Sequence, residues 1–445
     1  MLDLNKRFHF IGIGGVGMSA LAFILHDMGA TVSGSDTGDS NFMERLLSKG
    51  IRVFRKHDPS NLEGVHNVIY SSAISPDNPE LAFAKALGLN VMHRAELLKM
   101  VMDPYERIGI TGTHGKTTTS AMSLKVLMDA RLDPSGVIGG DFPYIGGNYR
   151  LGRGRFFIAE IDESDGSFLY FSGLRCLVIT NIEEEHLEHY GSFEELKEKI
   201  RKLAEVCELV IYNADDPNLG EMRLKGVSYG FESGSFRGRI LGDRSLFVDG
   251  FGRLDLYVAG VHNLSNALGV LALCDCLGID KGKAMESLSG FKGVKRRMEV
   301  LGEAEGIIFM DDYAHHPTEI RAVLLTLRKL YRDKRLVVLF QPHRYSRTAR
   351  MYKEMADSLR VADWIGITEI YSASEVPIEG ISGKLIYETL RVAGIENAYF
   401  FPDIEIAKDV LKGELKKEDI FITMGAGDVY KVGRALLVEF KGGCS

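Results

Sequence analysis

Residues 107–120 of the chain read RIGITGTHGKTTTS. Residues 108–111 are short, apolar and rich in β-branched side chains, which predicts a buried strand, and residues 117–130 predict a helix. A glycine turn between a strand and a helix is typical of a phosphate-binding loop. The stretch therefore predicts a nucleotide-binding α/β domain with a mainly parallel sheet.

The chemistry of this loop follows from its residue types. Gly112 and Gly115 can take backbone angles that other residues avoid, so consecutive N–H groups can turn toward an anion at the N-terminus of the helix. Lys116 would reach the β- and γ-phosphates, and the Thr117 hydroxyl would bind magnesium. Ile110 stands where the general pattern has a glycine, so the loop is a shorter variant. We expect ATP and magnesium here, with the nucleotide bound by Gly112, Thr113, Gly115, Lys116, Thr117 and Thr118.

Composition limits the classes of protein. A length of 445 residues suggests about three domains, and 45% hydrophobic with 26% charged residues is ordinary for a soluble protein. The net charge of −7 argues against a general nucleic-acid binder. We expect no signal peptide, because the first residues are followed only by a short apolar run interrupted by glycines. The sequence has no apolar run long enough for a membrane span, and its five cysteines form no CxxC pair. We therefore expect a cytoplasmic protein with no nucleic-acid or membrane partner; the oligomeric state stays open.

Three α/β blocks follow one another, at residues 1–104, 105–292 and 293–445. Expected strands at 8–13 and 67–71 lie in the first block, strands at 156–160 and 176–181 in the second, and strands at 335–340 and 419–424 in the third. Residues 227–258 predict short strands at an antiparallel edge, and Ser192 with Glu195 predicts the start of a helix. The order strand, helix, strand in each block predicts the α/β class, with mainly parallel sheets and helices on both faces.

A second glycine motif lies near the N-terminus. Gly12, Gly14 and Gly17 in FIGIGGVGMS follow an expected strand, and Asp36 lies near the spacing at which a ribose contact is found. Alone, the motif indicates an NAD-dependent oxidoreductase. The diphosphate of a nucleotide-linked sugar presents the same charges, however. The loop therefore predicts a diphosphate ligand but does not show whether NAD or a nucleotide-linked sugar carries it. A purely structural turn is a further alternative.

Carboxylates gather after the strand at 156–160, in the sequence EIDESD. Such crowding is unfavourable unless a cation shares the charges, so Glu160 is a candidate magnesium ligand. Capping of a helix by Asp162 or Asp165 is the alternative. His186, in TNIEEEHLEHY, follows another strand and is either a ligand to a second metal ion or structural.

Basic and histidine residues dominate the start of the third block. Arg296 and Arg297 lie at the expected domain junction, where an arginine could approach ATP, although a solvated basic turn is also compatible with them. His315, His316 and His343 lack the spacing of a zinc site. Arg344 and Arg347 suit bidentate binding of carboxylates.

Taken in order, these motifs resemble the Mur ligases of peptidoglycan synthesis along essentially the whole chain. The most specific stretches are GIGGVGMS, TGTHGKTTT, AEIDESD, TNIEEEHLEHY, GVHNLSNA, GVKRRME, DDYAHHPTE and QPHRYSRT. The resemblance implies three domains: an N-terminal Rossmann-like domain that holds the UDP part of the substrate, a central P-loop ATPase domain with a mostly parallel sheet, and a C-terminal Rossmann-like domain that holds the incoming amino acid. It implies that ATP phosphorylates the carboxylate of UDP-N-acetylmuramate and that L-alanine attacks the acyl phosphate.

The resemblance also implies roles for individual residues. The UDP-sugar is expected at Gly14, Gly15 and Gly17, with Asp36 nearby. Two magnesium ions are expected at Thr117, Glu160 and His186. The adenine is expected near His262, Asn263 and Asn266, with Arg297 and Asp312 approaching ATP. The new amide and the alanine carboxylate are expected near Tyr313, His315, His343, Arg344 and Arg347. The predicted catalytic residues are Lys116, His315, Arg344 and Arg347, with His315 or His343 as candidate base.

Alternatives remain at this point. A ligase that returns a murein tripeptide to UDP-N-acetylmuramate is the nearest, and an NAD-dependent oxidoreductase or a P-loop switch belongs to another class. Glu185 stands where the family usually has aspartate before the histidine. No carbamylated lysine can be assigned among Lys197, Lys199 and Lys202.

Overall fold

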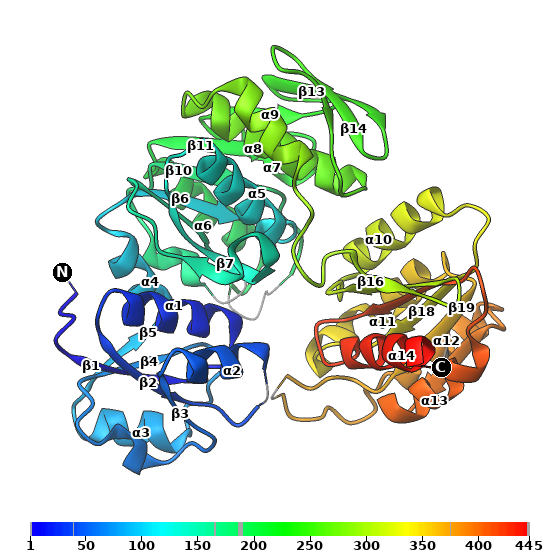
Figure 1. Cartoon of the computed structure of the whole chain (residues 1–445), viewed down its shortest axis with the longest axis horizontal. Helices are drawn as coiled ribbons and strands as arrows, with labels where there is room; N and C mark the ends of the chain where they lie inside the picture. Colours follow the sequence, from blue (N-terminus) through cyan, green and yellow to red (C-terminus); the bar gives the residue numbers. More distant parts are fainter. Residues whose placement is uncertain (1, 39, 164–165, 186–189, 374, 443–445) are drawn as a thin grey trace. The chain divides into compact units, whose positions relative to one another are not determined.

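The computed structural model describes residues 2–38, 40–163, 166–185, 190–373 and 375–442 (Figure 1). The chain divides into two compact units. The first comprises Met1–Tyr257 and Asn263–Lys292, and the second comprises Val258–His262 and Gly293–Ser445. Two sheets lie in the first unit and one lies in the second.

The N-terminal sheet is parallel, with the order β3-β2-β1-β4-β5. Its strands are β1 (Arg7–Ile11), β2 (Thr31–Ser35), β3 (Arg52–Phe54), β4 (Asn67–Tyr70) and β5 (Asn90–His93). The connections contain α1 (Val16–Asp27), α2 (Asn41–Ser48), η1 (Pro59–Leu62), α3 (Pro79–Ala86) and α4 (Arg94–Met102). Alternate residues of β1 face opposite sides: Phe8 and Phe10 join the cluster with α1 and α4, whereas Ile11 packs with α3. This order is that of a Rossmann-like half-sheet, as predicted.

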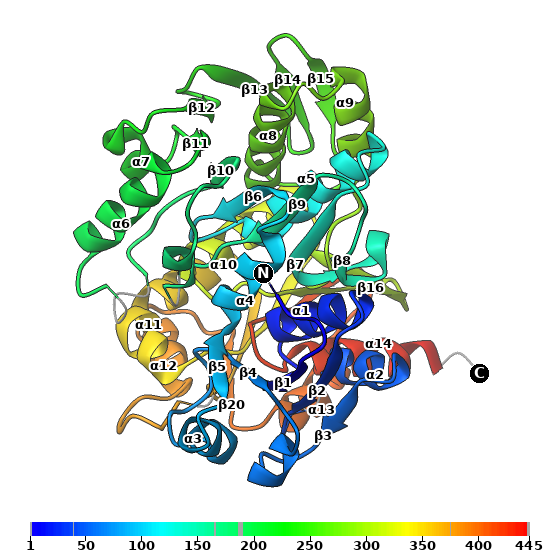
Figure 2. The same ribbon diagram turned by 90° about the vertical axis from the view of Figure 1, so that its left-hand side faces the viewer.

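The central sheet has ten strands in the order β15-β14-β13-β12-β11-β10-β6-β9-β7-β8. The strands are β6 (Glu106–Thr111), β7 (Ser135–Phe142), β8 (Gly147–Arg150), β9 (Phe156–Glu160), β10 (Cys176–Ile179), β11 (Leu209–Asn213), β12 (Val227–Gly230), β13 (Phe236–Gly242), β14 (Ser245–Val248) and β15 (Gly252–Asp255). Strands β12 to β7 in that order are parallel, and Figure 2 shows β10, β6, β9 and β7 in succession. The predicted antiparallel edge is present as β13-β14-β15.

Helices connect strands of this sheet or follow its last strand. They are α5 (Lys116–Asp129), η2 (Pro143–Ile145), η3 (Ser167–Tyr170), α6 (Phe193–Glu205), α7 (Pro217–Met222), α8 (Val261–Cys276) and α9 (Lys281–Ser289). The Ser192 hydroxyl accepts from Glu195 N–H at 3.2 Å, so the predicted start of α6 is confirmed. Strand β6 lies between β10 and β9, which places the loop after it at the carboxyl ends of three adjacent strands.

The third sheet has the order β16-β17-β21-β18-β19-β20 and is parallel except for β16. Its strands are β16 (Glu299–Ala304), β17 (Ile307–Asp312), β18 (Leu336–Phe340), β19 (Trp364–Thr368), β20 (Ala398–Phe401) and β21 (Ile420–Met424). Its helices are α10 (Pro317–Leu330), α11 (Tyr345–Leu359), α12 (Lys384–Val392), α13 (Ile404–Glu414) and α14 (Tyr430–Gly442). One apolar cluster joins the sheet to α10, α11 and α12, and another joins it to α13 and α14. Both faces are therefore covered, as a Rossmann-like domain requires.

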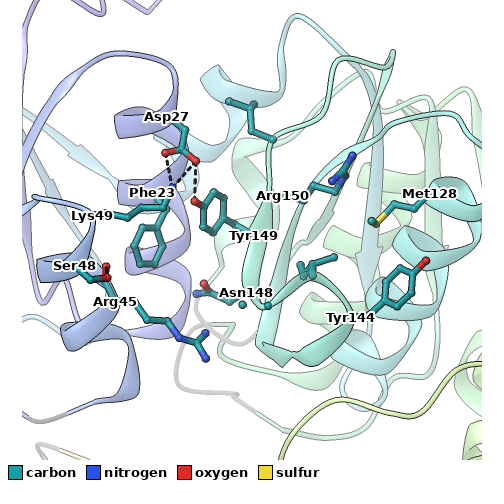
Figure 3. Close-up of a pocket in the computed structure, with 14 residues that line it drawn as sticks. Phe23, Asp27, Arg45, Ser48, Lys49, Met128, Tyr144, Asn148, Tyr149 and Arg150 are labelled. Carbon is teal, nitrogen blue, oxygen red and sulfur yellow. Dashed lines mark hydrogen bonds and ion pairs between the residues drawn. The ribbon is translucent and has the colours of Figure 1, made fainter.

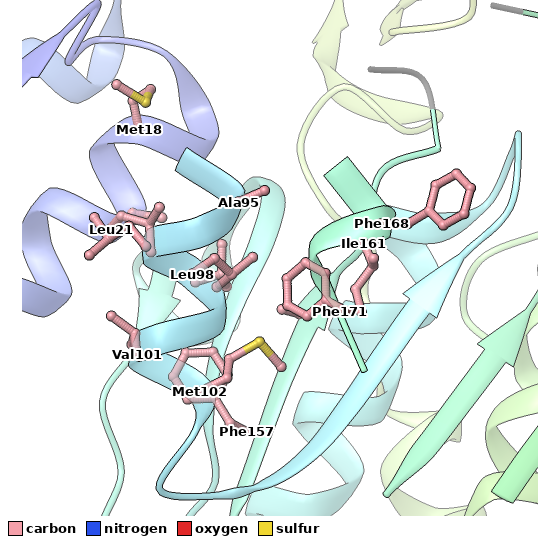
Figure 4. Packing of buried hydrophobic residues seen from close by; sticks show 14 of the residues in the cluster. Met18, Leu21, Ala95, Leu98, Val101, Met102, Phe157, Ile161, Phe168 and Phe171 are labelled. Atoms are coloured by element: carbon pink, nitrogen blue, oxygen red, sulfur yellow. The ribbon is translucent and has the colours of Figure 1, made fainter. Parts of the chain in front are cut away.

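The N-terminal and central sheets of the first unit share one hydrophobic cluster. Figure 4 shows Met18 and Leu21 of α1 and Leu98 of α4 in the same cluster as Phe157 of β9 and Phe171. These side chains are almost completely buried, so separating the two sheets would expose a continuous apolar surface to water.

Polar contacts reinforce this packing beside a pocket lined by α1, α2 and β8 (Figure 3). Asp27 accepts from Lys49 Nζ at 2.7 Å and from the Tyr149 hydroxyl at 2.7 Å. Arg45 makes two hydrogen bonds to Asp141, at 2.9 and 3.0 Å. The N-terminal helices are thus held to the central sheet by both apolar and charged contacts.

Among the described residues, no helix combines the length and the apolar character that crossing a bilayer requires.

Candidate active site

The predicted phosphate-binding loop lies between β6 and α5. Gly112 and Gly115 have φ angles of 127° and 83°, which confirms that the loop uses backbone angles favoured by glycine. A Cβ atom at Gly112 would lie 2.2 Å from Thr180 Oγ1, and one at Gly115 would lie 2.6 Å from Asn266 Oδ1. Both positions therefore require glycine for space as well as for backbone angle.

Residues after β10 hold this loop in shape. Thr113 N–H donates to the Asn181 carbonyl at 3.1 Å, and His114 N–H donates to Asn181 Oδ1 at 2.8 Å. The Thr180 hydroxyl donates to the His114 carbonyl at 2.6 Å. Sequence reasoning did not single out Thr180 or Asn181, although polar residues directly after a strand of a parallel sheet are a recognisable signal.

Lys116 is the first residue of α5 and lies in a strongly acidic environment. Its Nζ donates to the Gly112 carbonyl at 2.5 Å and lies 2.9 Å from Glu163 Oε2 and 3.9 Å from Asp162 Oδ1. Burial opposes the charged form, but the charges of Glu163 and Asp162 outweigh burial and raise the pKa of Lys116. The ammonium group is therefore charged at neutral pH.

Two of the three residues predicted to bind magnesium, Thr117 and Glu160, lie together. The Thr117 hydroxyl at the start of α5 donates to Glu160 Oε2 at 3.1 Å, and the Gly139 N–H donates to Glu160 Oε1. Glu160 ends β9, the strand next to β6. Hydroxyl and carboxylate oxygens are the ligands that magnesium prefers, so these two residues fit the expected ion.

The other described acidic residues of this segment have partners of their own. Asp162 accepts from Arg94 Nη2 at 3.0 Å, and Glu163 contacts Lys116. Gly166 and not Asp162 is the N-cap of η3, so helix capping by Asp162 is wrong. Asp165, and the predicted metal ligand His186, lie outside the described residues.

The N-terminal glycine loop is closed by Asp36. Gly14 N–H donates to Asp36 Oδ2 at 2.8 Å, and the Ser40 hydroxyl donates to the Gly14 carbonyl at 2.8 Å. Gly12 has a φ of 79°, and Gly15 is the N-cap of α1. The loop thus ends at a helix N-terminus, as an anion-binding turn requires.

Arg94 connects the two glycine loops of the first unit, and sequence reasoning missed it. A Cβ atom at Gly17 would lie 3.4 Å from Arg94 Nη1, while Arg94 Nη2 donates to Asp162, which lies near Lys116. Arg94 directly follows β5. Like Glu160, Arg94 lies at the carboxyl end of a parallel strand, where ligand-binding residues are common. This position could have marked Arg94 as a candidate site residue.

Two asparagines of α8 had been predicted near the adenine. Asn263 and Asn266 are both buried, and Asn266 lies against Gly115 of the phosphate-binding loop. The structure therefore brings Asn266 to the loop from a segment about 150 residues further along the chain. Thr118 is also buried, in the first turn of α5.

In the second unit, Asp312 ends β17 and accepts from the N–H groups of Met298 at 2.6 Å and Ala314 at 2.7 Å. Burial raises the pKa of Asp312 to about 6, although Arg297 opposes the rise. Arg297 lies over the Tyr313 ring at 5.2 Å, and burial together with Arg297 lowers the pKa of His262 to about 4. The charge of Arg297 thus affects the pKa values of both Asp312 and His262, two other residues predicted to lie near ATP.

Neighbouring Arg296 is structural, since it binds Asp311 at 3.0 Å and the Gly425 carbonyl at 2.6 Å.

A cluster of rings follows the carboxyl ends of β17, β18 and β19. The ring of Tyr313 lies 5.5 Å from that of His315, which lies 5.7 Å from that of His343, and His343 stacks on Tyr371 at 5.8 Å. Arg347 Nη1 lies 3.2 Å from His343 Nδ1. Burial, followed by the charges of the surrounding histidine and arginines, lowers the pKa of His343 to about 2, so its imidazole is neutral.

Arg344 has two unusual features in this cluster. Its φ of 71° lies in the left-handed region, which is strained for a residue with a side chain. Its Nε is buried and has no hydrogen-bond partner in the part of the chain that the structure describes. An orphaned guanidinium donor fits a carboxylate ligand.

His316 has a different task from His315. It is the N-cap of α10, where its side chain accepts from Thr318 N–H and Glu319 completes a capping box. His315 Nδ1 lies 3.0 Å from the Tyr313 carbonyl oxygen. Each histidine is thus engaged with its own element.

A lysine at a glycine turn, a threonine–carboxylate pair and parallel α/β sheets define a P-loop nucleotide-binding enzyme. Three family profiles match the chain: "Mur ligase family, catalytic domain" at residues 7–106, "Mur ligase middle domain" at 110–274 and "Mur ligase, glutamate ligase domain" at 296–427. The chain belongs to the Mur ligase family, as its motifs predicted.

Individual relatives match along their whole length. The UDP-N-acetylmuramate–L-alanine ligase of Dictyoglomus turgidum is 42% identical over 98% of this chain and 97% of its own. The enzyme of the same name from Desulforamulus reducens is 40% identical, covering 97% of each chain. The crystal structure of UDP-N-acetylmuramate-alanine ligase from Thermotoga maritima superposes with a TM-score of 0.88 at 32% identity, covering 99% of this chain and 100% of the other.

Proposed function

We propose that this protein is an ATP-dependent ligase that joins L-alanine to the carboxylate of UDP-N-acetylmuramate, in peptidoglycan synthesis. The observation that carries the proposal is the phosphate-binding loop, where Lys116 lies beside the Thr117–Glu160 pair. Relatives that are about 40% identical over nearly the whole chain are named for this activity. Their name also gives the two substrates that we propose, UDP-N-acetylmuramate and L-alanine. The same membership favours a nucleotide-sugar diphosphate over NAD at the N-terminal glycine loop.

We assign one substrate to each of three domains, at residues 1–104, 105–292 and 293–445. The glycine loop of Gly14, Gly15 and Gly17, closed by Asp36, is the proposed UDP-sugar site. The loop at Lys116 is the proposed ATP site. The ring cluster with Arg344 and Arg347 is the proposed site for alanine, whose carboxylate would satisfy the orphaned Arg344 Nε.

The reaction brings like charges together, because a carboxylate must approach a triphosphate. Each pair of unit charges at 4 Å costs about 4 kcal/mol at an effective dielectric constant of 20. The fixed ammonium of Lys116 offsets part of this repulsion, and positioning with charge stabilisation is the main requirement of phosphoryl transfer. Thr117 and Glu160 would hold magnesium, which when bound neutralises phosphate charge.

The alanine amine attacks only when it is neutral, so a base must take its proton. His343 has a pKa of about 2 and therefore cannot hold a proton near neutral pH. Of the two candidate bases, His315 is thus the better choice. A pH–rate profile that is unchanged in the His315→Ala variant would remove His315 as well.

We further propose that the protein works in the cytoplasm. Its reaction consumes ATP, and the four described cysteines are free thiols, as expected in a reducing compartment.

The direct test measures phosphate release from ATP with UDP-N-acetylmuramate and each amino acid in turn. Release is expected only when both UDP-N-acetylmuramate and L-alanine are present, with formation of the amide followed by mass spectrometry. Glycine, L-serine and a murein tripeptide are the competing acceptors. Preferred use of the tripeptide would identify a murein peptide ligase instead.

A further inference from the structure

The donor hydrogens of Lys116 are already used within the protein. An ammonium group has three donors. In the structure they serve the Gly112 carbonyl at 2.5 Å and both oxygens of Glu163, at 2.9 and 3.1 Å, with the Thr113 carbonyl as a more distant acceptor at 3.4 Å. A phosphate oxygen can therefore reach Lys116 only if one of these acceptors withdraws.

Glu163 is devoted to this contact. Its side chain is 3% exposed, and in the described part of the chain both of its carboxylate oxygens have Lys116 as their hydrogen-bond partner. The neighbouring Asp162 is held by Arg94 at 3.0 Å and stays 3.9 Å from Lys116. Glu163, and not Asp162, is thus the direct counter-ion of Lys116.

The two nearest acceptor groups, the Gly112 carbonyl and the Glu163 carboxylate, differ in how easily they can withdraw. The Gly112 carbonyl is part of a loop fixed by Thr180 and Asn181, whereas the Glu163 carboxylate ends a side chain with rotatable bonds. A carboxylate also repels a nearby phosphate, because both are negatively charged. We therefore expect Glu163, rather than the Gly112 carbonyl, to move away from Lys116 when a phosphate binds.

We propose that Glu163 is an exchange counter-ion: it holds Lys116 in the nucleotide-free enzyme and releases it to the phosphates of ATP. Glu163 is a positioning residue, because it acts through Lys116. The inference rests on the proposed function, since it assumes that ATP binds at this loop.

The exchange predicts opposite effects on the free and the bound enzyme. A buried lysine without its counter-ion is unfavourable, so loss of the Glu163 charge destabilises the nucleotide-free protein. The nucleotide-bound protein loses little, because the phosphates then neutralise Lys116. Replacement of the carboxylate should therefore tighten nucleotide binding while lowering the melting temperature of the free protein.

The test measures the Kd of Mg·AMP-PNP by isothermal titration calorimetry for the wild type and three variants. Glu163→Gln keeps the size and removes the charge, and we expect its Kd to fall about tenfold, or about 1.4 kcal/mol. Glu163→Asp keeps the charge and should stay within about threefold of the wild type. Asp162→Asn removes an equal charge one residue away and should gain less than Glu163→Gln.

An unchanged or weaker affinity in a folded Glu163→Gln variant would overturn the exchange and leave Glu163 structural. An equal or larger gain in Asp162→Asn would overturn it in favour of a general field effect. If wild-type protein does not bind Mg·AMP-PNP at all, the nucleotide site itself is refuted, which separates the two failures.

A crystal of the wild type with Mg·AMP-PNP gives a second readout that needs no variant. We expect Lys116 Nζ on phosphate oxygens and more than about 4 Å from the Glu163 carboxylate, beyond ion-pair distance. Retention of the Lys116–Glu163 contact beside bound nucleotide would refute the exchange.

Discussion

The hydroxyl of Thr117 lies 3.1 Å from Oε2 of Glu160, although the two residues are 43 positions apart in the chain. Both residues lie at the same edge of the central sheet. Glu160 is the last residue of β9, and Thr117 lies in the first turn of α5. Two oxygen atoms of the kind that magnesium prefers thus lie together beside the predicted phosphate-binding loop.

This pair predicts the magnesium requirement. We expect Thr117→Ala and Glu160→Gln each to raise the magnesium concentration for half-maximal phosphate release at least about tenfold, because each removes one oxygen ligand. Thr117→Ser keeps the hydroxyl and should behave like the wild type. The double variant should lose less than the sum of the single losses, since the residues share one ion. An unaltered magnesium titration in both single variants would contradict the assignment.

Lys116→Ala is expected to keep the fold but lose at least about a hundredfold in turnover, by analogy with removal of one charge-stabilising donor. Circular dichroism checks the fold, and phosphate release checks the rate. ATP consumption near the wild-type level would show that another cation performs this task.

Arg344→Lys tests the proposed alanine site. Lysine keeps the positive charge but lacks the planar fork and the Nε donor, so we expect the KM for L-alanine to rise about tenfold or more. The KM for ATP should change little. If the two KM values rise together, Arg344 serves the fold of this region rather than the amino acid.

Histidines of the second unit should make its stability depend on pH. The pKa of His262 falls to about 4 and that of His343 to about 2 on folding, from an ordinary value of 6.5. Between these values and 6.5 the unfolded chain binds more protons, so the free energy of unfolding decreases as pH falls below about 6.5. Each histidine should contribute on the order of 1 kcal/mol per pH unit in its window.

Urea unfolding from pH 7.5 to 4.5 measures this dependence. His262→Gln should make the dependence of the unfolding free energy on pH shallower. A slope equal to that of the wild type would show that His262 titrates normally in the folded protein.

The two sheets of the first unit should unfold together, because they share one apolar cluster. Asn148→Ala removes two hydrogen bonds from its side chain to α1, at 2.7 Å to the Val16 carbonyl and 3.0 Å to the Ser19 hydroxyl. We expect a loss of about 1–3 kcal/mol without a second transition. Separate transitions for the N-terminal and central regions, resolved by limited proteolysis along the urea series, would argue against a shared core.

Much of the fold follows from local patterns. Strand β9 begins and ends at the predicted residues, and β6, β10, β18 and β21 each differ from their predicted bounds at one end, by one or two residues. Parallel strands buried on both faces read as continuous apolar runs, which makes them easy to find. For the antiparallel edge β13-β14-β15, the sequence predicted only that short strands lie within residues 227–258 and not where each begins and ends. Short exposed strands have a weaker hydrophobic pattern than buried ones.

The candidate site was harder to predict where residues act through distant partners. Lys116, Thr117 and Glu160 were predicted individually from the sequence, because the type of each residue suggests its role. Arg94 and Glu163 were missed as partners, since nothing in the local pattern of either residue shows which opposite charge it will meet. His315 and His316 are adjacent in sequence, yet only their contacts separate a member of the ring cluster from a helix cap.

The sequence by itself determined the phosphate-binding loop, the glycine positions and the alternation of strands and helices, because backbone sterics and side-chain periodicity act over a few residues. Only the tertiary structure decided that Lys116 pairs with Glu163, 47 positions away, and Arg94 with Asp162, 68 positions away. Such pairs depend on which strands become neighbours, and strand order is fixed by burial across the whole domain rather than by any local pattern.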